Sequence, residues 1–400
     1  MRVLVIGAGP AGTRLATRIA ARDASARVTL CGAEAALPYD RVALSGLLAG
    51  EKELPQIITH DVAALRAARI AFRPATPIAA LDRAAREAVT ARGERIPYDR
   101  VVIATGSRAI RLAVPGAELP GVLTYRTMDD VRAMLLAARS GGNAVVVGGG
   151  LLGLEAAAGL AFRGMQVTVL HPVDWPMERQ LDAGAGGLLA RRMGTRGIRF
   201  VMPAQLASIE GEDRVRGLRL ADGQRIPAGI VVMAVGIRPD TALAASAGLA
   251  VGRGILADAG MRTSDPDILA IGECAEVEGR TIGLVAPALE QAEIAAATLA
   301  GEAAYWSARA ESSALKVSGT AVWSAGEILS TEGSEGVTLR DEEEDRYRRL
   351  FLREDRLVGA VLYGDVSDSG FYLNLIASRR PIGRMRAALA LGPAFLPDAA

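Results

Sequence analysis

The chain has 400 residues, of which 50% are hydrophobic and 23% charged, and its 46 basic and 45 acidic residues leave a formal net charge of +1. This composition predicts a globular protein of two or three domains, and so balanced a charge gives no support for binding to nucleic acid or to an anionic membrane surface. The sequence has neither a leader pattern nor an apolar run of about 18 residues, so we expect a cytoplasmic protein without a membrane segment.

The first predicted elements are a strand over 2–6, a tight glycine-rich turn, a helix over 13–22 and a second strand over 26–31. This order of strand, turn, helix and strand is the context in which a dinucleotide-binding loop has meaning.

The turn carries Gly7, Gly9 and Gly12 in the spacing GxGxxG. Glycine allows close approach of the backbone to a pyrophosphate, whose charge the helix N-terminus stabilises. We therefore expect a side chain at Gly12 to crowd the pyrophosphate. The acid that would bind the adenosine ribose is Glu34, although the same residue is also consistent with a plain loop carboxylate.

Alternating segments between 87 and 106 predict a hairpin that leads to a buried strand at 101–104. The strand, turn, helix and strand pattern then recurs, with glycines Gly148, Gly150 and Gly153 between an apolar run and an alanine-rich segment. Two such loops predict a protein that holds two dinucleotides.

The second strand of this repeat, over 166–170, ends at His171 instead of an acid. A carboxylate there would favour the 2′-hydroxyl of NADH, and an arginine the 2′-phosphate of NADPH. Because Asp174 and Arg179 both follow, the residues leave this choice open, with a lean toward NADH. The alternative is that His171 is a surface loop histidine.

From about residue 311 the pattern predicts consecutive antiparallel strands, followed by helices near 369–378 and 383–391. The only cysteines, Cys31 and Cys274, form no CxxC pair. We therefore expect no metal site, no iron–sulfur cluster and no redox-active dithiol in this chain, and we expect both thiols to be buried.

Several motifs together resemble a known family: IGAGPAG, LPYDRVALSGLLAGE, VVIATGS, VVVGGGLLGLE, MAVGIRPD and IGECAE. They are similar to the FAD-dependent pyridine nucleotide-disulfide oxidoreductases, here without the redox disulfide. MERQLD (177–182) and AVLYGD (360–365) narrow the resemblance to the FAD/NAD(P)H portion of the assimilatory nitrite reductase large subunit and to the nitrate reductase electron-transfer subunit.

The resemblance implies an α/β fold with two Rossmann-like dinucleotide-binding domains and a small α+β C-terminal domain. The expected domains are an FAD-binding domain over 1–115 and 237–310, an NAD(P)H-binding domain over 116–236 and the C-terminal domain over 311–400.

The resemblance also implies the residues of the two cofactor sites. For FAD they are Gly7, Gly9, Pro10, Ala11, Gly12, Glu34, Arg41, Ser45, Ile78, Thr105, Gly106, Gly272 and Glu273. Within this set Arg41 would reach the pyrophosphate, and Gly272 with Glu273 would cap the ribityl region. For NAD(P)H they are Gly148, Gly150, Leu151, Leu152, Gly153, His171 and Gly236.

Glu155 is the expected carboxylate beside the flavin, unless it is a first-turn acid that interacts with the helix dipole. Relatives of the ferredoxin reductase type usually carry a lysine where this chain has Gly46, so Glu155 lacks the partner that the resemblance would give it.

The expected activity is hydride transfer from NAD(P)H to FAD, followed by electron transfer to a separate redox partner, such as a nitrite or nitrate reductase component, a ferredoxin or a rubredoxin. Alternatives are an NADH oxidase and a flavin-based redox sensor without enzymatic turnover. The oligomeric state is left open by the sequence.

Overall fold

The structure is a computed structural model that describes residues 1–307, 312–317, 319–329 and 333–396. The chain forms two compact units, and each of them gathers segments that are distant in sequence. The first unit consists of 1–110, 126–133 and 237–308, and the second of 111–125, 134–236 and 309–400.

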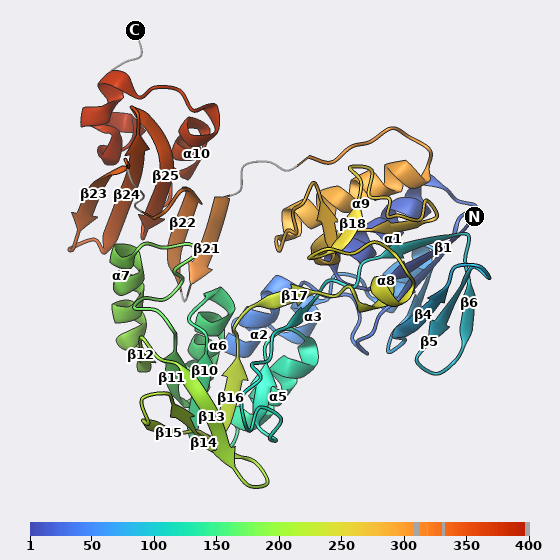
Figure 1. Cartoon of the computed structure of the whole chain (residues 1–400), viewed down its shortest axis with the longest axis horizontal. Helices are drawn as coiled ribbons and strands as arrows, with labels where there is room; N and C mark the ends of the chain where they lie inside the picture. Colours follow the sequence, from blue (N-terminus) through green and yellow to red (C-terminus); the bar gives the residue numbers. More distant parts are fainter. Residues whose placement is uncertain (308–311, 318, 330–332, 397–400) are drawn as a thin grey trace. The chain divides into compact units, whose positions relative to one another are not determined.

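The first unit, which contains the N-terminus (Figure 1), is built on a five-stranded parallel sheet in the order β19-β7-β1-β2-β3. Its strands are β1 (Arg2–Ile6), β2 (Arg27–Cys31), β3 (Ile70–Arg73), β7 (Arg100–Ile103) and β19 (Ile268–Ala270). The central strands are nearly continuous apolar runs because both faces of such a sheet are covered, and Val5 and Val102 are both 0% exposed.

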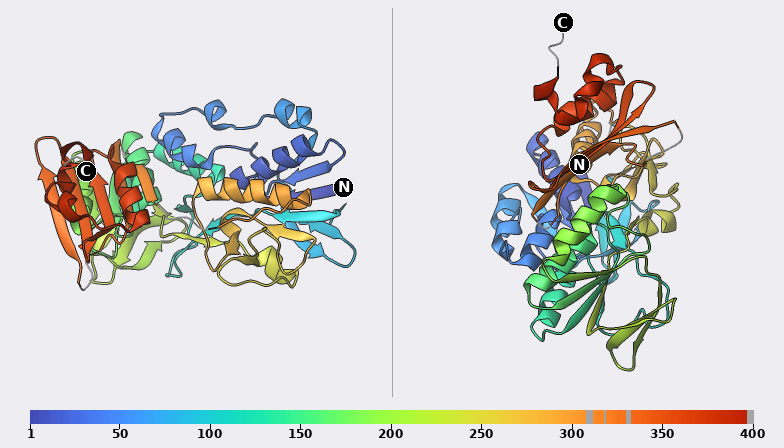
Figure 2. Two further views of the ribbon diagram at one scale, coloured as in Figure 1. Left: turned by 90° about the horizontal axis from the view of Figure 1, so that it is seen from above. Right: turned by 90° about the vertical axis from the view of Figure 1, so that its left-hand side faces the viewer.

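Helices α1 (Pro10–Arg22) and α9 (Val285–Leu299) pack side by side in the first unit (Figure 1, Figure 2). Arg14 and Arg18 of α1 both form ion pairs with Glu293 of α9. The rest of the unit consists of short elements: η1 (Arg41–Ala43), α2 (Leu44–Ala49), α3 (Leu54–Ile57), α4 (Val62–Ala67), the meander β4 (Ile78–Asp82), β5 (Glu87–Thr90) and β6 (Arg95–Pro97), the pair β8 (Ser107–Ala109) and β17 (Ile237–Pro239), α8 (Ala242–Ser246), the pair β18 (Ile255–Ala257) and β20 (Ala275–Val277), and η2 (Gly272–Cys274).

The second unit repeats this architecture with a parallel sheet in the order β12-β11-β10-β16-β9. Its strands are β9 (Val122–Thr124), β10 (Asn143–Val147), β11 (Gln166–Leu170), β12 (Ile198–Val201) and β16 (Ile230–Met233). The accompanying elements are α6 (Leu151–Phe162), α7 (Ala183–Gly194) and the meander β13 (Leu206–Gly211), β14 (Val215–Leu220) and β15 (Arg225–Pro227), while α5 (Met128–Ala138) contributes residues to both units.

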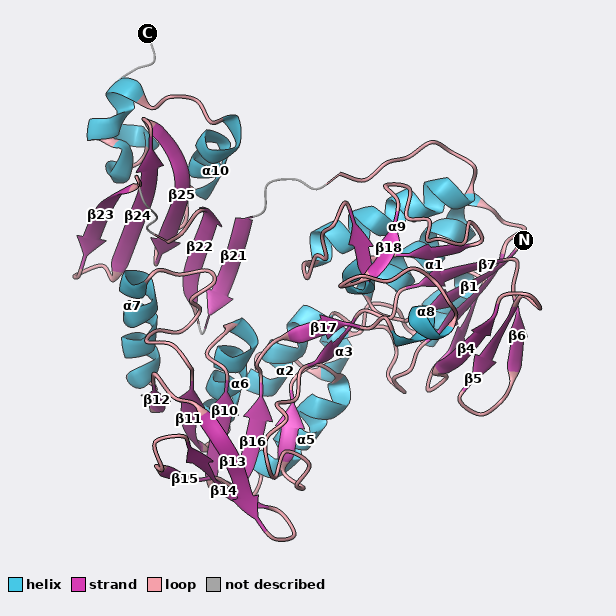
Figure 3. Cartoon of the chain, in the orientation of Figure 1, coloured by secondary structure: helices cyan, strands magenta, loops and turns pink. Residues whose placement is uncertain are grey.

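The second unit also contains a five-stranded antiparallel sheet near the C-terminus, in the order β21-β22-β25-β24-β23 (Figure 3). The strands are β21 (Ser312–Val317), β22 (Thr320–Gly326), β23 (Glu335–Asp341), β24 (Arg346–Arg353) and β25 (Arg356–Tyr363). Helix α10 (Ser369–Ser378) packs against it, with Tyr372 and Leu375 in a common core with Leu362. These elements confirm the predicted α/β class with two Rossmann-like sheets and a small α+β C-terminal part.

One predicted helix is wrong in type. The segment 383–391 forms two 3₁₀ helices, η3 (Gly383–Ala387) and η4 (Leu389–Leu391), followed by η5 (Pro393–Phe395). Gly383 has φ of +47°, a value that a regular α-helix does not contain.

Asp182 joins the C-terminal sheet to α7. Its carboxylate caps α7 by accepting from the amide of Ala185, and Oδ2 also accepts from the hydroxyl of Tyr347 at 2.6 Å and from Nη1 of Arg349 at 3.1 Å. Burial, together with the hydrogen bond to Asp182, raises the pKa of Tyr347 to about 12.

None of the described helices combines the length and the apolar character that crossing a membrane would require.

Candidate functional site: two glycine cradles and their polar surroundings

The first glycine loop, residues 7–12, connects β1 to α1, and we call it the first cradle. Its three glycines have different roles. A Cβ at Gly7, whose φ is +118°, would lie 2.1 Å from the carbonyl oxygen of Ala104, and a Cβ at Gly12 would lie 1.9 Å from the carbonyl oxygen of Gly7. A Cβ at Gly9 would meet nothing within 4 Å. Gly7 and Gly12 are therefore required by the packing of the loop itself, and Gly9 faces open space.

This corrects the expectation for Gly12. A side chain at that position would collide with the protein's own backbone before it could crowd a bound pyrophosphate. The glycine that borders the open space is Gly9, the N-cap residue of α1.

The start of α1 suits an anion. Gly9 provides no side-chain cap, Pro10 occupies the first turn, and the first turn contains no acidic residue. The positive end of the helix dipole and the amide groups of the turn are therefore not compensated by a side chain of that turn. The open space at Gly9 and this uncapped N-terminus fit the pyrophosphate of a dinucleotide.

The second loop, residues 148–153 between β10 and α6, repeats this geometry, and we call it the second cradle. A Cβ at Gly148 would lie 2.3 Å from the carbonyl oxygen of Ala234, and a Cβ at Gly153 would lie 1.9 Å from that of Gly148, while a Cβ at Gly150 would meet nothing within 4 Å. Leu151 and Leu152 form the first turn of α6, which again has neither a side-chain cap nor an acidic residue. The second cradle therefore fits a second pyrophosphate by the same physical argument.

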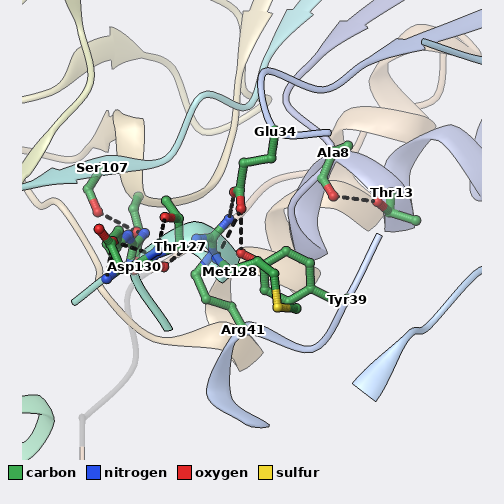
Figure 4. A network of polar contacts seen from close by, with 11 residues as sticks. Ala8, Thr13, Glu34, Tyr39, Arg41, Ser107, Thr127, Met128 and Asp130 are labelled. Atoms are coloured by element: carbon green, nitrogen blue, oxygen red, sulfur yellow. Dashed lines mark hydrogen bonds and ion pairs between the residues drawn. The ribbon is translucent and has the colours of Figure 1, made fainter. Parts of the chain in front are cut away.

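Glu34, three residues past β2, is the centre of a polar network (Figure 4). Its Oε1 accepts from Nη2 of Arg41 at 2.7 Å, and its Oε2 accepts from the hydroxyl of Tyr39 at 2.8 Å and from the amide of Met128 at 3.3 Å. Burial lowers the pKa of Arg41, but Tyr39 and Glu34 outweigh this effect, so the pKa of the guanidinium is raised overall. A carboxylate has about four acceptor positions, so Glu34 retains capacity for a ribose hydroxyl.

A second polar cluster surrounds Gly106, the positive-φ residue of the turn after β7. Oε2 of Glu273 accepts from the hydroxyl of Ser107 at 2.6 Å and forms an ion pair with Arg126. The carbonyl oxygen of Arg126 in turn accepts from Nη1 of Arg41 at 2.5 Å. Arg126 thus links the two predicted residues Arg41 and Glu273, although nothing in its local sequence marked it as a site residue.

Gly272 lies against the first cradle. Gly272 has φ of +77°, and a Cβ built on it would lie 3.3 Å from the Cβ of Ala11. Its amide donates to Oε1 of Gln291 at 2.7 Å, and Gln291 is only 3% exposed. The segment that precedes Glu273 is therefore anchored beside the glycine loop by α9.

The remaining FAD predictions lie in the same unit with more structural roles. The hydroxyl of Thr105 donates to the carbonyl oxygen of Asp240 at 2.8 Å. Ile78 begins β4 and packs against the core of the first unit. Ser45 is the second residue of α2. Their contact with a cofactor stays a prediction.

Gly46 stands where the resemblance would place a lysine, and the side chain of Lys52 lies against it. A Cβ at Gly46 would lie 3.3 Å from Cγ and 3.4 Å from Cδ of Lys52, so the aliphatic part of Lys52 covers this glycine.

Glu155 is the fifth residue of α6, beyond a first turn that contains no acid. The interpretation of Glu155 as a first-turn acid is therefore wrong.

His171 directly follows β11 and is 4% exposed, so the alternative of a surface histidine is wrong. Its Nδ1 accepts from the amide of Gly149 at 3.0 Å, and its Nε2 lies 3.0 Å from Oε2 of Glu178. Sequence reasoning did not single out Glu178. Gly236, the remaining prediction for this cradle, follows β16 with φ of +113°.

Comparison with known proteins agrees with this architecture. The family model described as pyridine nucleotide-disulphide oxidoreductase matches residues 1–296, and that of the rubredoxin NAD⁺ reductase C-terminal domain matches 312–380. The chain is 39% identical, over 95% of its length, to a nitrite reductase [NAD(P)H] of Bacillus subtilis, and 34% identical, over 95%, to the assimilatory nitrate reductase electron transfer subunit of the same organism.

The chain spans about half the length of these two relatives, 48% and 50% respectively. A solved structure of a ferredoxin reductase from Rhodopseudomonas palustris is 30% identical, with a TM-score of 0.83 over 92% of this chain and 93% of that one. The predicted family is thereby confirmed, and it is a family of oxidoreductases that use FAD and NAD(P)H. The chain belongs to the pyridine nucleotide-disulphide oxidoreductase family.

Proposed function

We propose that this chain is an FAD-dependent NADH reductase that passes electrons to a separate redox partner of nitrite or nitrate reduction. The observation that carries the proposal is the pair of cradles, one in each unit, in which the middle glycine faces open space at an uncapped helix N-terminus. Bound FAD would supply the chemistry, because a flavin accepts a hydride from a nicotinamide and releases electrons singly.

In this proposal the first unit holds FAD. The turn at Gly9 and the start of α1 bind the pyrophosphate, and the carboxylate of Glu34 accepts a hydrogen bond from a hydroxyl of the adenosine ribose. Arg41 forms an ion pair with Glu34, and Arg126 forms one with Glu273, so each arginine orients the carboxylate that it contacts.

In the same proposal the second unit binds NADH through Gly150 and the start of α6, and Glu155 of the same helix is the candidate carboxylate for a hydrogen bond with the nicotinamide amide. We infer NADH instead of NADPH because the carboxylate of Glu178 contacts His171 at the end of β11, whereas Arg179 is 85% exposed.

The partner is proposed from the chemistry of the chain. Its two cysteines, Cys31 and Cys274, are both buried and free, so no thiol pair takes up the electrons. The names of the relatives favour a nitrite or nitrate reductase component as the acceptor. A ferredoxin or rubredoxin is the second candidate, because residues 312–380 match a rubredoxin reductase C-terminal domain.

The experiment is steady-state oxidation of NADH and NADPH by the FAD-loaded protein, first with ferricyanide and then with each purified carrier. We expect ferricyanide reduction with NADH as the better donor, together with slow oxygen consumption. Rapid oxygen consumption without a carrier would identify an oxidase. Absence of turnover with every acceptor would identify a sensor.

A further inference from the structure

The end of strand β11 is the place where a dinucleotide-binding fold usually carries the acid that binds the adenosine ribose. In this chain that place is taken by His171, which is buried. An imidazole ring cannot take the place of a carboxylate that accepts hydrogen bonds from two adjacent hydroxyls. The contacts of His171 show where the chain provides a carboxylate instead.

The hydrogen bonds of His171 fix its tautomer. The amide of Gly149, inside the second cradle, donates to Nδ1, so Nδ1 carries the lone pair and the proton resides on Nε2. Nε2–H then donates to Oε2 of Glu178 at 3.0 Å. Only glycine at 149 leaves room for the ring, because a Cβ there would lie 2.8 Å from Cγ of His171.

The backbone fastens Glu178 to the same loop. The amide of Met177 donates to the carbonyl oxygen of Gly149 at 2.9 Å, and the Met177 side chain is 0% exposed. The carbonyl group of Gly149 thus holds the segment that carries Glu178, and its amide holds His171, which contacts Glu178. The side chain of Glu178 remains 34% exposed, so it is not closed off from a ligand.

We infer that Glu178 is the carboxylate that binds the 2′-hydroxyl of the adenosine ribose and thereby selects NADH, and that His171 is its positioning residue. This inference rests on the proposed binding of a nicotinamide dinucleotide at the second cradle. His171 engages Oε2, and the contact of Oε1 with Arg179 is long, at 4.0 Å, so Oε1 is the oxygen that accepts from the ribose. The same negative charge repels the 2′-phosphate of NADPH.

The test compares Glu178→Gln with the control Glu212→Gln, an acid of the same unit that is 79% exposed and pairs with Arg216. The KM and kcat for NADH and for NADPH are measured with ferricyanide on FAD-loaded protein. We expect Glu178→Gln to raise the KM for NADH about tenfold, to leave kcat unchanged and to lower the NADH-to-NADPH preference, because a charge-assisted hydrogen bond is lost. The control should change none of these values.

The variant His171→Asn tests whether His171 acts by positioning the carboxylate of Glu178 or only by supporting the local fold. Asparagine can place an acceptor for the amide of Gly149 near the position of Nδ1, but its side chain is too short to place a donor where Nε2 contacts Glu178, so the KM for NADH should rise severalfold at constant kcat. In the double variant with Glu178→Gln, the KM should be no higher than in Glu178→Gln alone.

Three results would overturn the inference. They are an unchanged KM for NADH in Glu178→Gln, a loss of NADH preference in Asp174→Asn instead, and fully additive effects of His171→Asn and Glu178→Gln. Failure of the proposed function looks different, because the unmodified protein would then oxidise neither NADH nor NADPH.

Discussion

Replacing Gly9 by valine tests whether the open space in the first cradle is the FAD pyrophosphate site. The backbone at Gly9 has φ of −74° and ψ of −177°, an extended conformation that valine adopts without strain, and a Cβ there meets nothing within 4 Å. The apoprotein should therefore lose no more than about 1 kcal/mol of stability. The side chain would, however, keep the phosphates away from the turn amides, and losing two charge-assisted hydrogen bonds costs about 3 kcal/mol, or a factor of about 100 in the Kd for FAD.

The matched variant is Gly12→Ala, whose Cβ would lie 1.9 Å from the carbonyl oxygen of Gly7. Because that contact is with backbone, we expect a loss of folding stability of about 3 kcal/mol or more, even without FAD. Calorimetric titration of the apoproteins with FAD and thermal unfolding followed by circular dichroism measure the two effects separately. The reasoning is refuted if Gly9→Val binds FAD with unchanged Kd, or if Gly12→Ala is as stable as the unmodified protein.

Three further predictions concern the second cradle, a buried thiol and the C-terminal sheet. Gly150→Val should leave FAD binding intact and raise the KM for NADH at least tenfold, and unchanged kinetics would remove the second cradle from the mechanism. Burial raises the pKa of Cys31 from 9.0 to about 11, so its contribution to stability is complete below pH 9 and is lost as the pH rises toward 11. The free energy of unfolding, measured in urea at pH 8 and pH 10.5, should therefore fall less between these pH values in Cys31→Ala than in the unmodified protein. An equal fall in both proteins would contradict the raised pKa of Cys31. Tyr347→Phe removes the donor to Asp182 and should cost about 1 kcal/mol of unfolding free energy, measured by urea titration, whereas no change would mean that Arg349 alone satisfies the carboxylate.

The duplicated framework was predictable from sequence because its signals are local. Each parallel sheet has strands that are short apolar runs, and each cradle lies between such a run and a helix that starts within a few residues. Gly7 and Gly148 both have positive φ, as the tight turn requires. Even the difference between the middle and outer glycines follows from the backbone path, although it becomes visible only when the contacts of each Cβ are known.

The polar partners were not predictable, because the chain brings them together from a distance. Arg126 contacts Glu273 across 147 residues, and no periodicity or spacing rule connects the two. Lys52 covers Gly46 only because α2 ends and the chain turns back over it. The sequence left open whether His171 is a site residue or a surface histidine, and its burial depends on the segment that carries Glu178 folding back onto Gly149.

The most direct test of the central claim is anaerobic stopped-flow spectroscopy of the FAD-loaded protein mixed with NADH. The account predicts rapid bleaching of the oxidised flavin absorbance, with a rate that saturates as NADH increases, followed by reoxidation when a one-electron acceptor is added. A flavin that stays oxidised for minutes in excess NADH and in excess NADPH would contradict it.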